Sequence, residues 1–183
     1  ALVHPQEQVG LGLEREGVLQ AGAVDGVDAG THDSRAAAPG GAFVAVPGFT
    51  VDGVTFVPQA MANGVSLVVA ERDVDGAPTA VVPDARAALA ALATATAGHP
   101  SHDVVVYGIT GTNGKTTSSY VLHGILSAAY GEEHTGLLTT AEIVVGTHRE
   151  PAVRTTGEAP QVQGNLARMR DAGVEHVVLE TSS

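Results

Sequence analysis

The chain of 183 residues contains no cysteine and no tryptophan, and only 3% of its residues are aromatic. Without cysteine, neither a disulfide framework nor a thiolate metal site can form, which fits a reducing compartment, so we expect a cytoplasmic protein. Apolar residues nevertheless make up 44% of the chain. The cores must therefore be built from Ala, Val and Leu, as is usual in helix-covered parallel sheets.

Basic residues are also scarce. The chain has 9 Lys and Arg but 20 Asp and Glu, which gives a net charge of −11. Such a field repels nucleic acid and anionic membranes, and we expect neither as a partner. No apolar run is long enough to span a bilayer, and residues 1–20 lack the pattern of a signal peptide. We expect a monomer. The start at Ala1 and the stop at Ser183, directly after an apolar run, indicate a fragment.

The first half of the chain predicts a small α/β unit. Residues 1–30 are rich in Gly and acidic residues and show little periodicity, so they are interpreted as a poorly specified lead-in. From residue 42 onward strand and helix patterns alternate, and residues 31–98 are interpreted as one domain. The predicted strands are 43–46, 65–70 and 79–82, and the predicted helices are 54–63 and 84–97.

The second half restarts the alternation after a polar segment, residues 98–103, which contains a proline and is predicted to be the domain boundary. Residues 104–183 then form the second α/β unit. Its predicted strands are 104–107, 135–138, 142–145 and 174–179, and its predicted helices are 115–130 and 158–172. Apolar side chains of the first of these helices are predicted to share one face: Val121, Leu122, Ile125, Leu126 and Ala129.

A glycine-rich segment between the strand 104–107 and the helix 115–130 is the most informative feature. It reads Gly108-Ile109-Thr110-Gly111-Thr112-Asn113-Gly114-Lys115-Thr116-Thr117. A site that binds a nucleoside triphosphate needs inward-pointing backbone N–H groups, the positive end of a helix dipole, a cation and a hydroxyl for Mg²⁺. Glycines, helix start, Lys115 and Thr116 supply these. The alternative is a strand–helix turn that binds nothing, but a lysine at a helix N-terminus is unfavourable by about 0.3–1 kcal/mol without an anion.

The segment departs from the strict phosphate-loop template, which has glycine where this chain has Ile109. In the form Thr-Gly-Thr-Asn-Gly-Lys-Thr-Thr it resembles the loop of the Mur ligases and of their relative folylpolyglutamate synthetase. The resemblance implies that ATP and Mg²⁺ are bound. The residues implied for ATP are Gly111, Thr112, Asn113, Gly114, Lys115, Thr116 and Thr117.

Three further segments resemble one branch of the Mur ligases, the enzymes that add the third amino acid to UDP-N-acetylmuramoyl-L-alanyl-D-glutamate. The order and spacing of the segments also agree with that branch, from about residue 31 to the end. They are Asp33-Ser34-Arg35 followed by residues 39–48, Arg154-Thr155-Thr156 with Glu158-Ala159, and residues 175–183. The implied fold is a small N-terminal α/β uridine-binding domain, followed by the start of a P-loop (Rossmann-like) central ATP-binding domain.

The resemblance also implies substrate-binding residues. Ser34 would bond the uracil or ribose and Arg35 the diphosphate, although a surface Asx or Ser turn is the alternative. Thr155 and Thr156 would hold the muramoyl-peptide end, although threonines before a helix are also ordinary N-caps. Gly157 replaces the family's proline there, which frees the backbone.

Glu180 ends an apolar strand, at the edge where ligands of doubly wound folds collect. In the family the matching glutamate holds Mg²⁺, and a carboxylate beside the Thr116 hydroxyl suits a hard cation. The alternative is a structural carboxylate that caps a neighbouring helix. Ser182 and Ser183 would reach toward substrate. The eight histidines show no metal-ligand spacing and receive no role.

The implied reaction is phosphorylation of the precursor's terminal carboxylate by ATP, followed by attack of an amine to give an amide. Lys115 and Glu180 are the expected catalytic residues, and UDP-N-acetylmuramoyl dipeptide and an amino acid are the expected partners. The family's carbamylated lysine and its C-terminal domain, which selects meso-diaminopimelate or L-lysine, would lie beyond Ser183, so we expect this chain alone to be inactive. Two alternatives stay open, a folylpolyglutamate synthetase-like ligase and a non-catalytic P-loop nucleotide-binding module.

Overall fold

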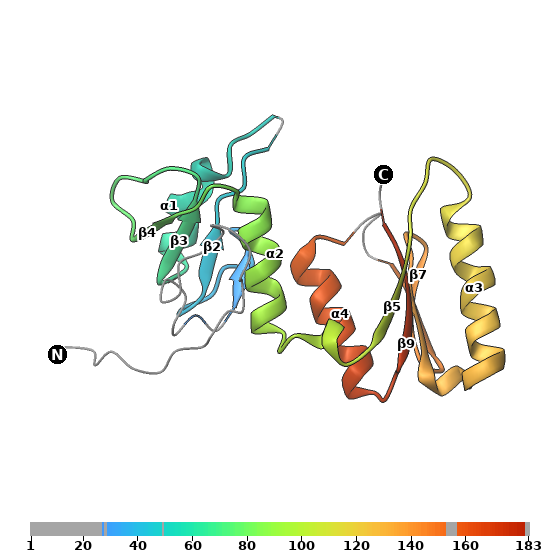
Figure 1. The fold of residues 1–183 in the computed structure, drawn as a ribbon. Helices are drawn as coiled ribbons and strands as arrows, with labels where there is room; N and C mark the ends of the chain where they lie inside the picture. The colour runs from blue at the N-terminus through green and yellow to red at the C-terminus, as the bar shows by residue number, and fades with distance from the viewer. Residues whose placement is uncertain (1–26, 28, 49, 153–156, 182–183) are drawn as a thin grey trace. The chain divides into compact units, whose positions relative to one another are not determined.

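The computed structural model describes residues 27, 29–48, 50–152 and 157–181 (Figure 1). The chain divides into two compact units, of which the first ends at Thr96 and the second begins at Ala97. Each unit carries its own sheet. The division falls close to the polar segment 98–103, and the α/β class predicted from the sequence is confirmed.

The first unit contains a wholly parallel sheet of four strands in the order β1-β2-β3-β4. Its strands are β1 (Gly30–Thr31), β2 (Ala42–Val44), β3 (Leu67–Ala70) and β4 (Thr79–Val81). Its helices are the 3-10 helix η1 (Gly53–Phe56), α1 (Val57–Ala62) and α2 (Ala85–Thr96). Because all strands are parallel, their carboxyl ends share one edge, where ligands of such sheets bind.

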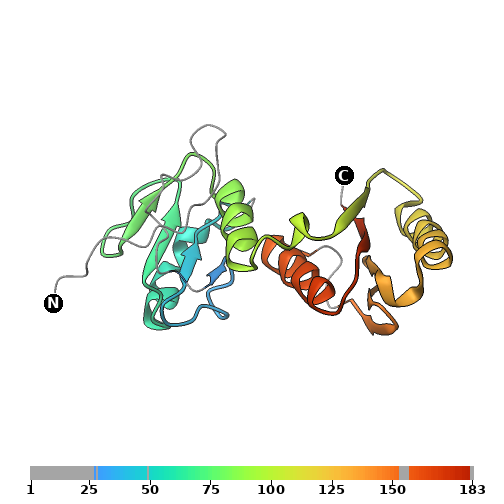
Figure 2. The same cartoon turned by 60° about the horizontal axis from the view of Figure 1, so that its bottom comes forward.

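Helices α1 and α2 cover the sheet of the first unit (Figures 1 and 2). Val57 and Ala60 of α1 pack with Phe43 of β2 in one apolar cluster. Against β1, α2 comes so close that a methyl group on Gly30 would lie 2.3 Å from Cδ2 of the buried Leu92. The missing side chain at Gly30 therefore permits this helix–strand contact.

The second unit contains a five-stranded sheet in the order β5-β9-β6-β7-β8. Strands β5, β9 and β6 are parallel, and β7 and β8 add an antiparallel hairpin. The strands are β5 (Val105–Ile109), β6 (Thr135–Leu138), β7 (Glu142–Val145), β8 (His148–Pro151) and β9 (His176–Glu180). The helices are η2 (Pro100–His102), α3 (Lys115–Tyr130), η3 (Glu132–His134) and α4 (Ala159–Asp171).

Helices α3 and α4 lie on opposite faces of this second sheet (Figures 1 and 2). Leu126 of α3 packs with Val178 of β9 in one cluster, whereas Leu166 and Met169 of α4 pack with Val177 in another. Successive residues of β9 thus face opposite helices, as the two-residue period of a strand requires. The sheet is the central layer between the two helices, with β6 fully buried. The candidate phosphate loop, residues 110–114, leads from β5 into α3.

Most predicted elements are found, with ends that differ by up to three residues. The prediction of one helix over residues 54–63 was wrong in its first turn. The 3-10 helix η1 occupies that turn, and the α-helix begins only at Val57. Strands β1 and β8 were not predicted. β1 has only two residues, and β8 carries polar side chains and Pro151, so neither shows an alternating apolar pattern. No helix in the described part of the chain is long and apolar enough to cross a membrane.

The predicted apolar face of α3 was wrong in part. Leu126 is buried, but Val121 and Ile125 are each 59% exposed. The side chains that turn toward the sheet with Leu126 include Ser119 and His123, which are both buried. The short loop after β5 sets the position of α3 against the sheet. That position decides which face of the helix the sheet buries.

Candidate functional site

The loop between β5 and α3 takes a backbone path that requires glycine. Gly111 and Gly114 have φ angles of 148° and 76°, in the region that side chains with a Cβ rarely adopt. Thr112, Asn113 and Gly114 are exposed. The helix begins at Lys115 directly after the loop, so its free N–H groups and its positive dipole end face the loop.

Lys115 lies where a helix dipole disfavours a cation, and it is the single lysine of the chain. Its Nζ donates a hydrogen bond of 2.7 Å to the Gly111 carbonyl oxygen. The ammonium group is thus held over the phosphate loop by the loop itself. An anion bound there would meet both the lysine and the helix N-terminus.

Glu180 lies beside the first turn of α3, although 64 residues separate it from Thr116 in the sequence. Strands β5 and β9 pair in parallel with Ile109 opposite Glu180, which brings the end of β9 next to the start of the loop. The Thr116 hydroxyl lies 3.1 Å from each Glu180 carboxylate oxygen. The Thr140 backbone N–H donates to Glu180 Oε2 at 3.4 Å.

The surroundings of Glu180 fit a hard divalent cation. The residue is only 9% exposed, and in the described part of the chain its carboxylate has no ion-pair partner. Carboxylate and hydroxyl oxygens are the ligands that Mg²⁺ prefers. Among the described residues no group of three or more His, Cys, Asp or Glu could hold a metal ion. A cation at Glu180 and Thr116 would therefore take its other ligands from nucleotide phosphates and water, as Mg²⁺ commonly does.

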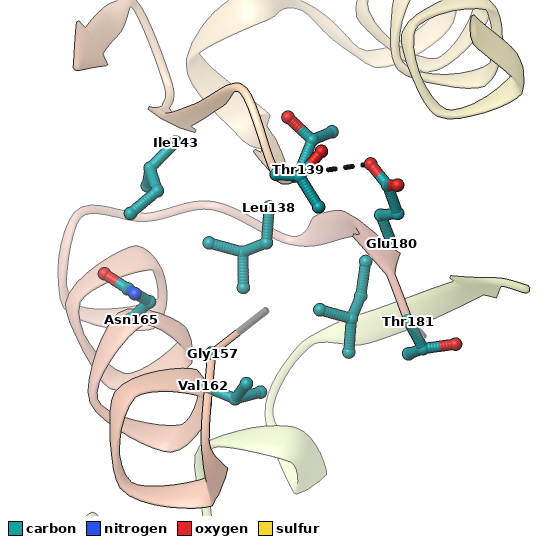
Figure 3. A pocket seen from close by; sticks show the side chains of 10 residues that line it. Leu138, Thr139, Ile143, Gly157, Val162, Asn165, Glu180 and Thr181 are labelled. Carbon is teal, nitrogen blue, oxygen red and sulfur yellow. Dashed lines mark hydrogen bonds between the residues drawn. The ribbon is translucent and has the colours of Figure 1, made fainter. Parts of the chain in front are cut away.

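A cavity of about 130 Å³ adjoins Glu180, between the end of β6 and α4 (Figure 3). One part of its wall is apolar and comes from Leu138, Ile143, Val162 and Leu179. Its polar wall comes from Thr139, Thr140, Asn165, Glu180 and Thr181. The cavity can therefore take a small group with an apolar body that presents its polar end to the Glu180 carboxylate.

Four predicted substrate residues, Thr155, Thr156, Ser182 and Ser183, lie outside the described residues. Their described sequence neighbours, Gly157 and Thr181, both line the cavity beside Glu180. A methyl group on Gly157 would lie 3.2 Å from Val162 Cγ2, so the position where the family has proline is closely packed against α4. The assignment of the four residues stays a prediction.

Ser34 and Arg35 follow β1 at the carboxyl edge of the first sheet. Ser34 is 5% exposed, and its hydroxyl donates a 2.7 Å hydrogen bond to Gln59 Oε1. The Arg35 side chain is 73% exposed and pairs with Asp33 at 2.8 Å, which raises the pKa of Arg35. The Asp33 carboxylate also accepts from the Arg35 N–H, so the Asx turn considered from the sequence is present. Binding of uridine here stays a prediction.

Thr139 and Thr140 were not singled out from the sequence. They follow β6 at the same sheet edge as the phosphate loop, and both line the cavity. The available signal was a pair of hydroxyl residues directly after a buried parallel strand. Without the strand order, however, nothing indicated that the end of β6 lies next to Glu180.

Two family models match the chain over most of its length. One, described as "Mur ligase family, catalytic domain", matches residues 27–107. The other, described as "Mur ligase middle domain", matches residues 109–183. The boundary between the two matches lies within β5.

Curated relatives are named as ligases or synthetases of UDP-N-acetylmuramoyl peptides. A UDP-N-acetylmuramyl-tripeptide synthetase of Deinococcus radiodurans is 47% identical over 160 residues, which is 84% of this chain and 32% of the relative. A UDP-N-acetylmuramoyl-L-alanyl-D-glutamate–2,6-diaminopimelate ligase of Geobacillus thermodenitrificans is 43% identical over 152 residues, 82% of this chain and 31% of the relative. The chain thus spans about a third of the length of the curated relatives it matches.

Solved structures share the fold. A UDP-N-acetylmuramoyl-L-alanyl-D-glutamate–2,6-diaminopimelate ligase matches with a TM-score of 0.68 at 24% identity, over 85% of this chain and 32% of that one. The MurF ligase of Thermotoga maritima, solved in complex with ADP, matches with a TM-score of 0.54 at 25% identity, over 84% of this chain and 32% of that one. The family models, the relatives and the fold agree, and the chain belongs to the Mur ligase family.

Proposed function

We propose that this chain is part of an ATP-dependent ligase that adds the third amino acid to UDP-N-acetylmuramoyl-L-alanyl-D-glutamate. The observation that carries the proposal is the Thr116 hydroxyl, 3.1 Å from both oxygens of Glu180, at the end of a phosphate loop. The names of the relatives supply the substrate class, because they are a tripeptide synthetase and a diaminopimelate ligase. We propose the activity for the whole protein, since these residues match a third of such relatives.

The phosphate loop would bind the β- and γ-phosphates of ATP. Residues Gly111 to Gly114 would offer backbone N–H groups to the phosphates, and the start of α3 would add the positive end of its dipole. Lys115 would exchange the Gly111 carbonyl for phosphate oxygens, because a charged phosphate is the stronger acceptor. The loop that holds the lysine before binding would thus aim it at the phosphoryl group that moves.

Glu180 and the Thr116 hydroxyl are the residues that would hold Mg²⁺, since they offer hard oxygen donors and Glu180 has no ion-pair partner among the described residues. The ion would supply neutralisation of charge on the phosphate oxygens. The chain's own contribution is to fix the carboxylate against the first turn of α3. Preorganised charge of this kind provides most of the acceleration in phosphoryl transfer.

The reaction would proceed in two steps with no covalent enzyme intermediate. The terminal carboxylate of the precursor attacks the γ-phosphorus, the bond from that phosphorus to the bridging oxygen breaks, and ADP leaves. The amine nitrogen of the incoming amino acid then attacks the acyl carbon of the acyl phosphate. Phosphate leaves, the nitrogen loses a proton to solvent, and an amide remains.

The two ends of the substrate have separate proposed sites. The cavity beside Glu180 would take the peptide end that carries the reacting carboxylate. Thr155, Thr156, Ser182 and Ser183 are proposed to bind the same end of the substrate. The uridine end would be held in the first unit, around Ser34, with Arg35 at the diphosphate. In that role the Ser34 hydroxyl oxygen would accept a hydrogen bond, because its proton already bonds Gln59.

We further propose a cytoplasmic monomer whose partners are the UDP-sugar peptide, an amino acid and ATP, with no nucleic acid or membrane partner. The absence of cysteine and the charge of −11 support this setting. The substrates proposed here are small molecules. We therefore expect the protein to need no macromolecular partner for turnover.

The test is a phosphate-release assay on the full-length protein with ATP, Mg²⁺ and UDP-N-acetylmuramoyl-L-alanyl-D-glutamate. Meso-diaminopimelate and L-lysine are supplied in separate reactions, because the residues described here do not select between them. We expect release to require all components, and the product mass to rise by one amino acid less one water.

Two other outcomes would contradict the proposal. Activity with a folate and glutamate, but not with the UDP-sugar peptide, would indicate a folylpolyglutamate synthetase-like ligase. Tight ATP binding without phosphate release under any of these conditions would indicate a non-catalytic nucleotide-binding module.

A further inference from the structure

The turn between β6 and β7, residues 139–142, is closed by one buried hydroxyl. Thr139 is 8% exposed, and its Oγ1 accepts from the backbone N–H groups of Ala141 at 3.2 Å and Glu142 at 3.1 Å. The same hydroxyl donates to the Glu142 carbonyl oxygen at 3.1 Å, as does the Thr139 backbone N–H. Four hydrogen bonds therefore fix the backbone on either side of Thr140.

The fixed turn directs one backbone group at the proposed metal-binding carboxylate. The Thr140 backbone N–H donates to Glu180 Oε2, with an N···O distance of 3.4 Å. A dashed line in Figure 3 marks a hydrogen bond that ends on the Glu180 carboxylate. The Thr116 hydroxyl meets the same carboxylate from α3. Glu180 is thus held from two elements, and in the described part of the chain both contacts come from uncharged donors.

We propose that Thr139 is a positioning residue for the Mg²⁺ site, acting through the Thr140 N–H on Glu180. The inference rests on the proposed function, because it takes Glu180 as the ligand of the nucleotide-bound cation. A carboxylate ligand works best when its second oxygen is held by the protein, since this fixes the direction of the first. Thr139 itself touches neither the carboxylate nor the phosphates.

The experiment compares three substitutions in the full-length protein. Thr139→Val keeps the side-chain shape and removes the hydroxyl, whereas Thr139→Ser keeps the hydroxyl. The matched control is Thr135→Val, at the other end of β6. Thr135 is fully buried, and its hydroxyl bonds Ser127 Oγ at 2.8 Å and the Glu132 carbonyl at 3.1 Å. The control therefore removes a buried hydroxyl at the start of β6, away from Glu180, whereas Thr139 directly follows the end of that strand.

Calorimetric titration of ATP at a series of Mg²⁺ concentrations gives the Mg²⁺ concentration for half-maximal binding. We expect Thr139→Val to raise this concentration about tenfold or more, as loss of groups that orient metal ligands commonly does. Thr139→Ser and Thr135→Val should stay within about twofold of the unsubstituted protein. ATP binding without Mg²⁺ should be equal in all four proteins, and kcat of Thr139→Val should recover at high Mg²⁺.

Equal Mg²⁺ requirements of Thr139→Val and Thr135→Val would overturn the inference while leaving the proposed function intact. If the unsubstituted protein bound no ATP at any Mg²⁺ concentration, the proposed function would fail first. If Thr139→Val does not fold, the Thr140 amide signal in the unsubstituted protein provides the test by nuclear magnetic resonance. That signal should shift on addition of Mg²⁺ and ATP and in Glu180→Gln, and an unchanged signal would refute the inference.

Discussion

Replacement of Lys115 by alanine separates the binding of phosphate from the stability of the fold. Among the described residues, Lys115 Nζ makes one hydrogen bond, of 2.7 Å, to the Gly111 carbonyl oxygen. Loss of that bond should cost about 0.5–1.5 kcal/mol of folding free energy. Removal of a positive charge from a helix N-terminus should return about 0.3–1 kcal/mol. The two terms nearly cancel, so we expect the unfolding free energy to change by less than about 1 kcal/mol.

The effect on the reaction should be much larger. If Lys115 stabilises the phosphoryl group in the transition state, its loss should lower kcat of the full-length enzyme by two or more orders of magnitude. This corresponds to about 2.7 kcal/mol or more in the barrier, since each factor of ten is about 1.36 kcal/mol. Lys115 is the single lysine of these 183 residues.

Three measurements on the same variant check this prediction: a thermal melt, a titration with the UDP-sugar peptide, and a phosphate-release assay. The melt and the UDP-sugar titration should match those of the unsubstituted enzyme, because the uridine end is expected to bind the other unit. Arg168→Ala is the control, since it removes an exposed cation that pairs with Glu150 on the same unit. An active Lys115→Ala enzyme would refute the catalytic role, and an unfolded one would show that the lysine is structural.

Three further predictions concern stability, packing and nucleotide affinity. Burial, followed by the nearby Arg149 charge, lowers the pKa of His123. Folding therefore favours the neutral ring, so the melting temperature should fall as pH drops below about 6.5. His123→Leu should reduce this fall, and identical pH profiles of the two proteins would disprove the contribution of His123. Gly30→Ala should destabilise the first unit by about 1–3 kcal/mol in urea unfolding, because its methyl group meets Leu92, and by less in a Leu92→Ala background. Equal losses in both backgrounds would contradict the packing argument. The 183-residue chain alone should bind ATP·Mg²⁺ more weakly than micromolar in calorimetry and release no phosphate, because the exposed loop must order the ligand with few contacts. Micromolar binding or turnover would contradict this.

The sequence by itself determined where α3 begins and ends. The predicted bounds, residues 115–130, are the observed ones, because Gly114 and Gly131 both have positive φ angles that stop a helix from continuing. The fold class was equally accessible, since apolar strands and helix patterns alternate along most of the chain. The phosphate loop and Glu180 could be proposed from the sequence, because their spacing and their resemblance to the family are local properties of the chain.

Only the tertiary structure decided which side of α3 is covered and what surrounds Glu180. A helical period fits both the stripe of Val121 and Ile125 and that of Ser119, His123 and Leu126, and the position of the sheet selects the second. The neighbours of Glu180 follow from strand order, because β9 inserts between β5 and β6 although it comes last in the chain. That insertion brings Thr116 and the 139–142 turn to the Glu180 carboxylate. These contacts could not be predicted from the sequence, because the residues lie far apart along the chain.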